Sequence, residues 1–92
     1  GVKPGSLLPL HASAQGKVAL AFGDPELLRR LMQQPLQALT PHTQTDPVEL
    51  AAGIRQIRQQ GWAVAPNESM IGLNTIAAPV LDSLGNYVGA VA

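Results

Sequence analysis

The spacing of apolar residues changes from a helical period to a strand period at Gly61, and this change constrains the fold more than any other feature of the chain. Before Gly61, Leu50, Ile54 and Ile57 recur at helical spacing. After it, short apolar runs alternate with turn residues. Helices followed by hairpin-linked strands indicate an α+β fold, in which an antiparallel sheet is packed with helices.

Three helices are expected, each delimited by sequence signals. In the first, Ser13 is a plausible cap and Gly23 a stop. The other two open on Asp-Pro pairs, because Asp caps a helix and proline is tolerated at its first position. The third also carries Glu49 three residues after its cap, as a capping box requires. The expected helices span 14–22, 25–34 and 47–60.

The strands are expected at 62–64, 75–81 and 87–92. The middle strand is predicted to be mostly buried and to be interrupted by Pro79. Turn residues at 82–86 join it to the last strand as a hairpin. The chain ends within this apolar run and begins without an initiator Met, so we expect both ends to lie inside a longer protein.

Composition limits the classes of function. Ninety-two residues suffice for one small domain. Six basic and six acidic residues give no net charge, whereas a free-standing nucleic-acid binder needs a basic surplus to neutralise phosphates. The absence of cysteine excludes disulfides and cysteine-based zinc sites. No apolar run approaches the roughly 20 residues of a membrane span. We therefore expect no contact with DNA or a membrane, and no metal.

One pair of residues has the chemistry of a catalytic site. Ser13 lies two residues after His11, so the two could act as nucleophile and base. We favour the alternative that Ser13 is a helix cap and His11 a structural hydrogen-bonding residue. Common hydrolase and metalloprotease motifs are absent. The sequence therefore predicts that the chain is not an enzyme.

Two further residues leave alternatives open. Glu68 is the only acid between Gly61 and Asp82. It is interpreted as a solvated turn residue or a partner for a backbone N–H, with an acid at a pocket rim as the second interpretation. Trp62, the only tryptophan, belongs either to the core or to a subunit interface, because an aromatic side chain contributes a large buried area in both places.

The start of the first helix is a candidate binding site. The segment 13–16 would present backbone N–H groups and the positive end of the helix dipole, which suit a carboxylate. Its small side chains would leave room for a ligand.

The segment 8–17, LPLHASAQGK, resembles the opening of the effector domain of the IclR (isocitrate lyase regulator) family. Three later segments agree with that family in order and spacing. They are a Thr-rich link with Thr40, Thr43 and Thr45, the helix end 57–62 (IRQQGW), and the segment 68–80 (ESMIGLNTIAAPV).

The resemblance implies a GAF/PAS-like sensor fold and makes residues 1–92 a fragment of an effector-binding domain. In such cytoplasmic regulators this domain binds a small metabolite, often a carboxylic or aromatic acid, and assembles subunits into dimers or tetramers. DNA is bound by a separate N-terminal winged helix-turn-helix domain, and no cofactor is implied. The family's pocket positions fall on Leu8, Ala14, Gln15, Ala65, Thr75 and Ala92.

The chain departs from some relatives at two of these positions. Ala65 and Ala92 stand where those relatives carry polar residues that hydrogen-bond the effector. The pocket is therefore expected to be more apolar, which argues against a very small, fully polar acid such as glyoxylate. Two other functions remain as alternatives. One is a pure assembly module without a ligand, and the other an acyl hydrolase using Ser13 and His11.

Overall fold

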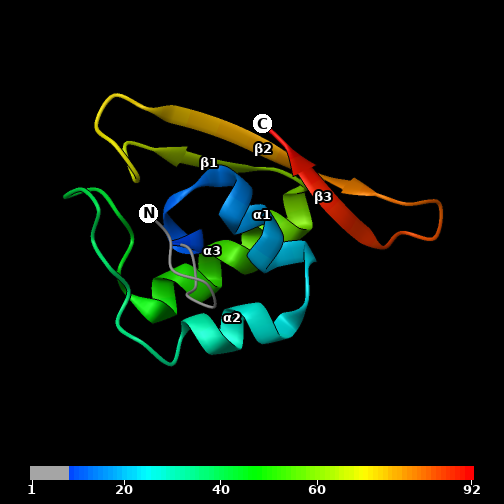
Figure 1. Ribbon diagram of the computed structural model, residues 1–92, viewed down its shortest axis with the longest axis horizontal. Coiled ribbons are helices and arrows are strands. Elements are labelled where there is room, and N and C mark those ends of the chain that lie inside the picture. Colours follow the sequence, from blue (N-terminus) through cyan, green and yellow to red (C-terminus); the bar gives the residue numbers. More distant parts are fainter. Residues whose placement is uncertain (1–8) are drawn as a thin grey trace, which may run out of the picture.

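The computed structural model describes residues 9–92 as helices packed against one face of a three-stranded sheet (Figure 1). The expectation of an α+β fold is confirmed. Its elements are a short 3-10 helix η1 (Leu10–Ala12), helices α1 (Ala14–Phe22), α2 (Pro25–Leu31) and α3 (Pro47–Gln60), and strands β1 (Ala63–Pro66), β2 (Asn74–Leu81) and β3 (Tyr87–Val91).

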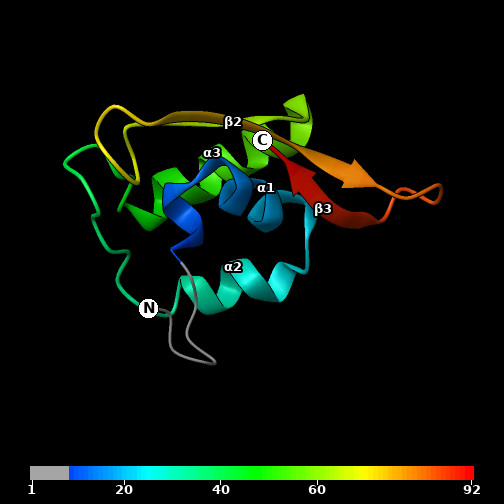
Figure 2. The same ribbon diagram turned by 45° about the horizontal axis from the view of Figure 1, so that its top comes forward.

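Helix α1 is the central element. It contacts α2, α3 and all three strands. Figures 1 and 2 show α1 between the sheet and α2. Val18 on α1 is fully buried, and Ala63 and Ala77 on the inner face of the sheet are buried as well. Small side chains on the sheet allow α1 to lie close to β1 and β2.

The helix caps follow the sequence signals. The side chains of Ser13, Asp24 and Asp46 each accept a hydrogen bond from a backbone N–H in the first turn of their helix. Gly61 ends α3 with a φ of 88°, a conformation that glycine adopts without strain. The predicted capping box does not form, because the Asp46 side chain accepts from the N–H of Val48 and not from that of Glu49. The backbone N–H of Asp46 donates to the Gln44 side chain, so Glu49 does not reach back to it.

The sheet is antiparallel with strand order β1-β2-β3, and it differs from expectation in burial. Strand β2 was predicted to be mostly buried, but Ile76 and Val80 are exposed on its outer face. The prediction was wrong because apolar residues fill both faces of β2, while only the inner face is covered by a helix. Pro79 lies inside β2 without interrupting it, and the pairing with β3 becomes irregular just after it, between Val80 and Leu81.

Several boundaries also shift, and β1 spans Ala63–Pro66 instead of the expected 62–64. Helix α2 ends at Leu31, earlier than the proline at position 35 suggested, and Ala92 lies past the end of β3. Among residues 9–92, no helix is long and apolar enough to cross a membrane.

Candidate functional site

The start of α1 is closely packed. The Ser13 hydroxyl oxygen accepts a hydrogen bond from the Gly16 N–H at 3.0 Å, which confirms Ser13 as a helix cap. A Cβ on Gly16 would lie 2.3 Å from the carbonyl oxygen of Leu10. The glycine is therefore required for contact between α1 and η1. This corrects the expectation that small side chains in segment 13–16 leave room for a ligand, because at Gly16 that room is filled by backbone.

Space for a ligand is found beside this turn instead. A hollow of about 330 Å³ opens along one side of η1 and α1, and we call it the α1 hollow. It is lined by Pro9, Leu10, Ser13, Gln15, Gly16, Ala19 and Ser69. Most of this lining is apolar, and the exposed Gln15 contributes an amide.

The predicted site residues are only partly brought together. Ala65 and Thr75 are directly paired across β1 and β2, and Ala14 shares the buried core with Ala65. Ala92 is exposed and lies in a separate shallow hollow with Trp62. Of the predicted residues that the structure describes, only Gln15 lines the α1 hollow. Leu8 falls outside the described residues.

His11 and Ser13 form no catalytic pair. The His11 side chain is buried, and its Nε2 lies 2.7 Å from the Gln37 carbonyl oxygen, so Nε2–H donates there. Its Nδ1 has no hydrogen-bond partner within residues 9–92. Because Ser13 caps α1 and the structure records no hydrogen bond between the two side chains, the structural interpretation of both residues holds. The described part of the chain also holds no cluster of three metal-ligating side chains.

Glu68 is the residue that sequence reasoning interpreted least well. Its side chain is only 7% exposed and forms an ion pair with Lys17, whose side chain is 13% exposed. Its other oxygen accepts the Gln44 N–H at 3.1 Å, so the predicted backbone partner is confirmed and the solvated turn is wrong. The ion pair ties α1 to the segment after β1.

The Thr-rich link closes around the same residue. The Thr43 hydroxyl donates to the Glu68 carbonyl oxygen, and the Thr40 hydroxyl to that of Asn67, each at 2.5 Å. Both threonines are buried. The threonines of this loop were the available signal in the sequence for its packing, since buried hydroxyls need partners, but Thr45 is exposed and takes no part.

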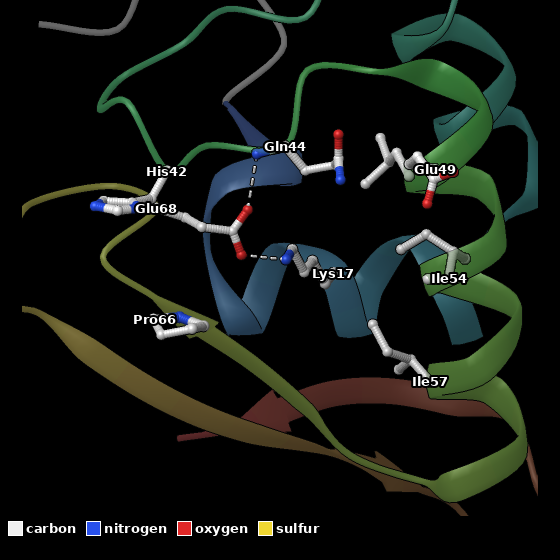
Figure 3. A pocket seen from close by; sticks show the side chains of 10 residues that line it. Lys17, His42, Gln44, Glu49, Ile54, Ile57, Pro66 and Glu68 are labelled. Carbon is white, nitrogen blue, oxygen red and sulfur yellow. Dashed lines mark hydrogen bonds and ion pairs between the residues drawn. The ribbon is translucent and has the colours of Figure 1, made fainter.

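A second and larger space lies beside this ion pair. It has a volume of about 370 Å³ and runs along α3, so we call it the α3 cleft. Figure 3 shows Lys17 reaching from α1 toward Glu68, with Ile54 and Ile57 pointing inward from α3. The complete lining is Lys17, His42, Gln44, Glu49, Leu50, Gly53, Ile54, Ile57, Pro66 and Glu68.

Comparison with known proteins identifies the class. The chain is 40% identical over 88 residues to the HTH-type transcriptional repressor AllR of Escherichia coli (strain K12). The matched segment covers 95% of the chain and 32% of that protein. It is 33% identical over 92 residues to the Pca operon regulatory protein of Acinetobacter baylyi, covering 99% of the chain and 33% of that protein. These relatives are transcription regulators and not enzymes.

Among solved structures, the chain is similar to a double mutant of the PobR transcription factor inducer-binding domain from Acinetobacter, in complex with 3-hydroxybenzoic acid. The TM-score is 0.81 at 33% identity, covering 90% of this chain and 49% of that one. The family model for the bacterial transcriptional regulator IclR C-terminal domain matches residues 2–92. The chain therefore belongs to the IclR family of transcription regulators, and it spans about a third of the length of the curated relatives it matches.

Proposed function

We propose that this chain is the ligand-sensing and assembly domain of a cytoplasmic IclR-type repressor or activator, and that its effector is a small carboxylic or aromatic acid. In this proposal DNA is bound by a separate N-terminal winged helix-turn-helix domain. The observation that carries it is the likeness to an inducer-binding domain that holds an aromatic acid. The α1 hollow supports it, because a helix N-terminus and an apolar lining suit the two ends of such a molecule.

The chemistry divides between the two parts of the effector. The carboxylate lies near the first turn of α1, where the helix dipole is positive and the N–H groups of Ala14 and Gln15 have no acceptor within the helix. The Gly16 N–H is not available, because Ser13 holds it. The apolar part lies against Pro9, Leu10 and Ala19. Ala65 and Ala92 do not line the α1 hollow, so the preference for an effector less polar than glyoxylate rests on this apolar lining alone.

Regulation then follows from differential binding. The effector favours one arrangement of subunits and so changes the spacing of the DNA-binding heads. The shift between arrangements can be no larger than the difference between the effector's affinities for the two.

The test is a thermal-shift and calorimetric titration with 3-hydroxybenzoate, benzoate and benzyl alcohol. The two acids should raise the melting temperature, whereas the uncharged alcohol should have little effect, because a ligand stabilises only the state it binds. Gln15→Trp should abolish the shift by filling the α1 hollow. Gln59→Trp, at an exposed position on α3, is the matched control. Equal responses of the two variants would argue against this site.

A pure assembly module is the second candidate, and one observation favours it. Trp62 is 44% exposed, and Val64, Ile76 and Val91 are exposed on the same outer face of the sheet. Exposed contiguous apolar surface is typical of interaction sites. Of the two alternatives for Trp62, the core position is thus wrong, and its place in a subunit interface remains a proposal. Sensing and assembly are compatible, since the outer sheet face and the α1 hollow share no residue.

A further inference from the structure

The α3 cleft is separate from the proposed effector site. It shares no lining residue with the α1 hollow, and it lies on the side of α1 that faces α3 and the Thr-rich link (Figure 3). Its volume of about 370 Å³ falls in the range typical of small-molecule sites. Nothing in the proposed acid-sensing role uses it.

One wall of the cleft is apolar, and the side chains that form it are largely buried in the core. Leu50, Ile54 and Ile57 form this wall from α3. Gly53 lies among them in the middle of the helix, where glycine destabilises by about 0.5–1 kcal/mol relative to alanine. A Cβ at Gly53 would meet nothing within 4 Å. Packing therefore does not require this glycine, and the missing side chain keeps the mouth of the cleft wide.

The charges of the lining are unbalanced. The Lys17 ammonium is already paired with Glu68. Within residues 9–92, Glu49 forms no ion pair. Its expected capping-box contact is also missing, because the Gln44 side chain accepts the Asp46 N–H instead. With His42 counted as neutral, the lining thus holds one ammonium and two carboxylates. The N-terminus of α3 offsets about half a charge, which leaves the cleft negative.

The hydrogen-bonding groups also have a definite pattern. An ammonium carries three donors, and the structure records only one from Lys17, to Glu68. The Gln44 side-chain oxygen accepts from Asp46, so its amide nitrogen keeps both donors. Glu49 offers acceptors at the rim. A ligand that fits this pattern carries a cationic donor for Glu49, a neutral acceptor such as a hydroxyl or carbonyl oxygen for Lys17 and Gln44, and an apolar body for the α3 wall.

We propose that the α3 cleft is a second ligand site, which binds a small primary amine with an aliphatic or aromatic body. Its ammonium group pairs with Glu49, and its body lies against Ile54 and Ile57 over Gly53. A carboxylate is excluded from this site, because it would face two carboxylates and a lysine that is already paired. The two sites therefore select ligands of opposite charge.

The experiment titrates the chain with benzylamine, benzyl alcohol and benzoate, and follows backbone amide resonances by NMR. Benzylamine should shift Gln44, Gly53 and Ile54, and benzyl alcohol should shift them at higher concentration only. Benzoate should leave them unchanged and act at Gln15 if the acid-sensing proposal holds. Because the probes report on different resonances, each proposal can fail without the other.

Two variants and their controls sharpen the result. Glu49→Gln keeps the shape of the rim and removes its charge, so benzylamine binding should weaken about fivefold, whereas Glu26→Gln on α2 should change nothing. Gly53→Leu should abolish binding by filling the mouth, and Gly53→Ala should largely retain it. Melting curves establish that each variant is folded. The proposal would be overturned if benzylamine left the amide resonances of the cleft residues unshifted. It would also be overturned if Glu49→Gln bound benzylamine with unchanged affinity.

Discussion

Lys17 and Glu68 form a largely buried ion pair, and a buried charge depends strongly on its partner. Removal of one partner leaves the other charge unpaired in a poorly solvated place, at a typical loss of about 3–5 kcal/mol. An exposed pair contributes at most about 1 kcal/mol, because solvent screens it. The chain offers both cases, since Arg29 and Glu26 on α2 form a pair whose side chains are 60% and 56% exposed.

Glu68→Gln should therefore destabilise the chain by about 3 kcal/mol, and Glu26→Gln by less than about 0.5 kcal/mol. Urea denaturation measures both. Lys17→Met combined with Glu68→Gln should recover part of the loss, because no unpaired ammonium remains. If the double variant equals the sum of the two single variants, the pair does not couple energetically.

Asp82 provides a prediction about pH. The backbone N–H of Asn86 donates to its carboxylate and holds the pKa of Asp82 below its ordinary value of 3.8, with further hydrogen bonds from the side chain of Asn86 and the backbone of Leu84. A lowered pKa in the folded state stabilises the turn above pH 3.8, and this contribution is lost as the pH falls through the folded-state pKa. Carboxyl carbon shifts in an NMR titration should show it. A midpoint at or above 3.8 would contradict the turn geometry.

At the scale of the elements, α1 and α3 each contain a glycine. Replacement by alanine should change the stability of the chain in opposite directions at the two positions. Gly53→Ala should raise stability by about 0.5–1 kcal/mol, because alanine favours the helix and meets open space. Gly16→Ala should lower it by about 1–3 kcal/mol, because its Cβ would overlap the Leu10 carbonyl and force α1 away from η1. Thermal melts of the two variants compare these signs directly. If Gly16→Ala raised the stability instead, η1 would have to move away from the new Cβ at no cost in free energy.

The same two helices show how far the sequence predicts this fold. Local signals gave the bounds of α1 and α3 correctly, because caps and stops depend on neighbouring residues only. The partners of Glu68 could not be inferred, since Lys17 lies 51 residues away. The exposure of Ile76 was missed for a related reason, because an apolar sequence does not reveal whether a helix covers that face. The resemblance to a family supplied candidate pocket positions, but only packing shows that Ala14 is fully buried.

For the whole molecule, the sheet determines how chains could meet. Its inner face is covered by α1, and its outer face exposes Trp62, Val64, Ile76 and Val91 without a charged residue among them. An aromatic residue within an apolar patch is typical of the centre of an interface. The net charge of zero adds no long-range repulsion between copies. These features make self-association through the sheet the expected behaviour.

Sedimentation velocity over a range of concentrations tests this expectation. The chain should sediment increasingly as a dimer or larger species as its concentration rises, because burial of apolar surface drives association. Ile76→Lys should shift the equilibrium to the monomer, since an unpaired ammonium on the interface is strongly unfavourable. Val48→Lys is the matched control, because Val48 is an exposed valine on α3 and not on the sheet. A monomer at every concentration would remove the assembly role, and equal loss of association in both variants would place the contact elsewhere than the sheet.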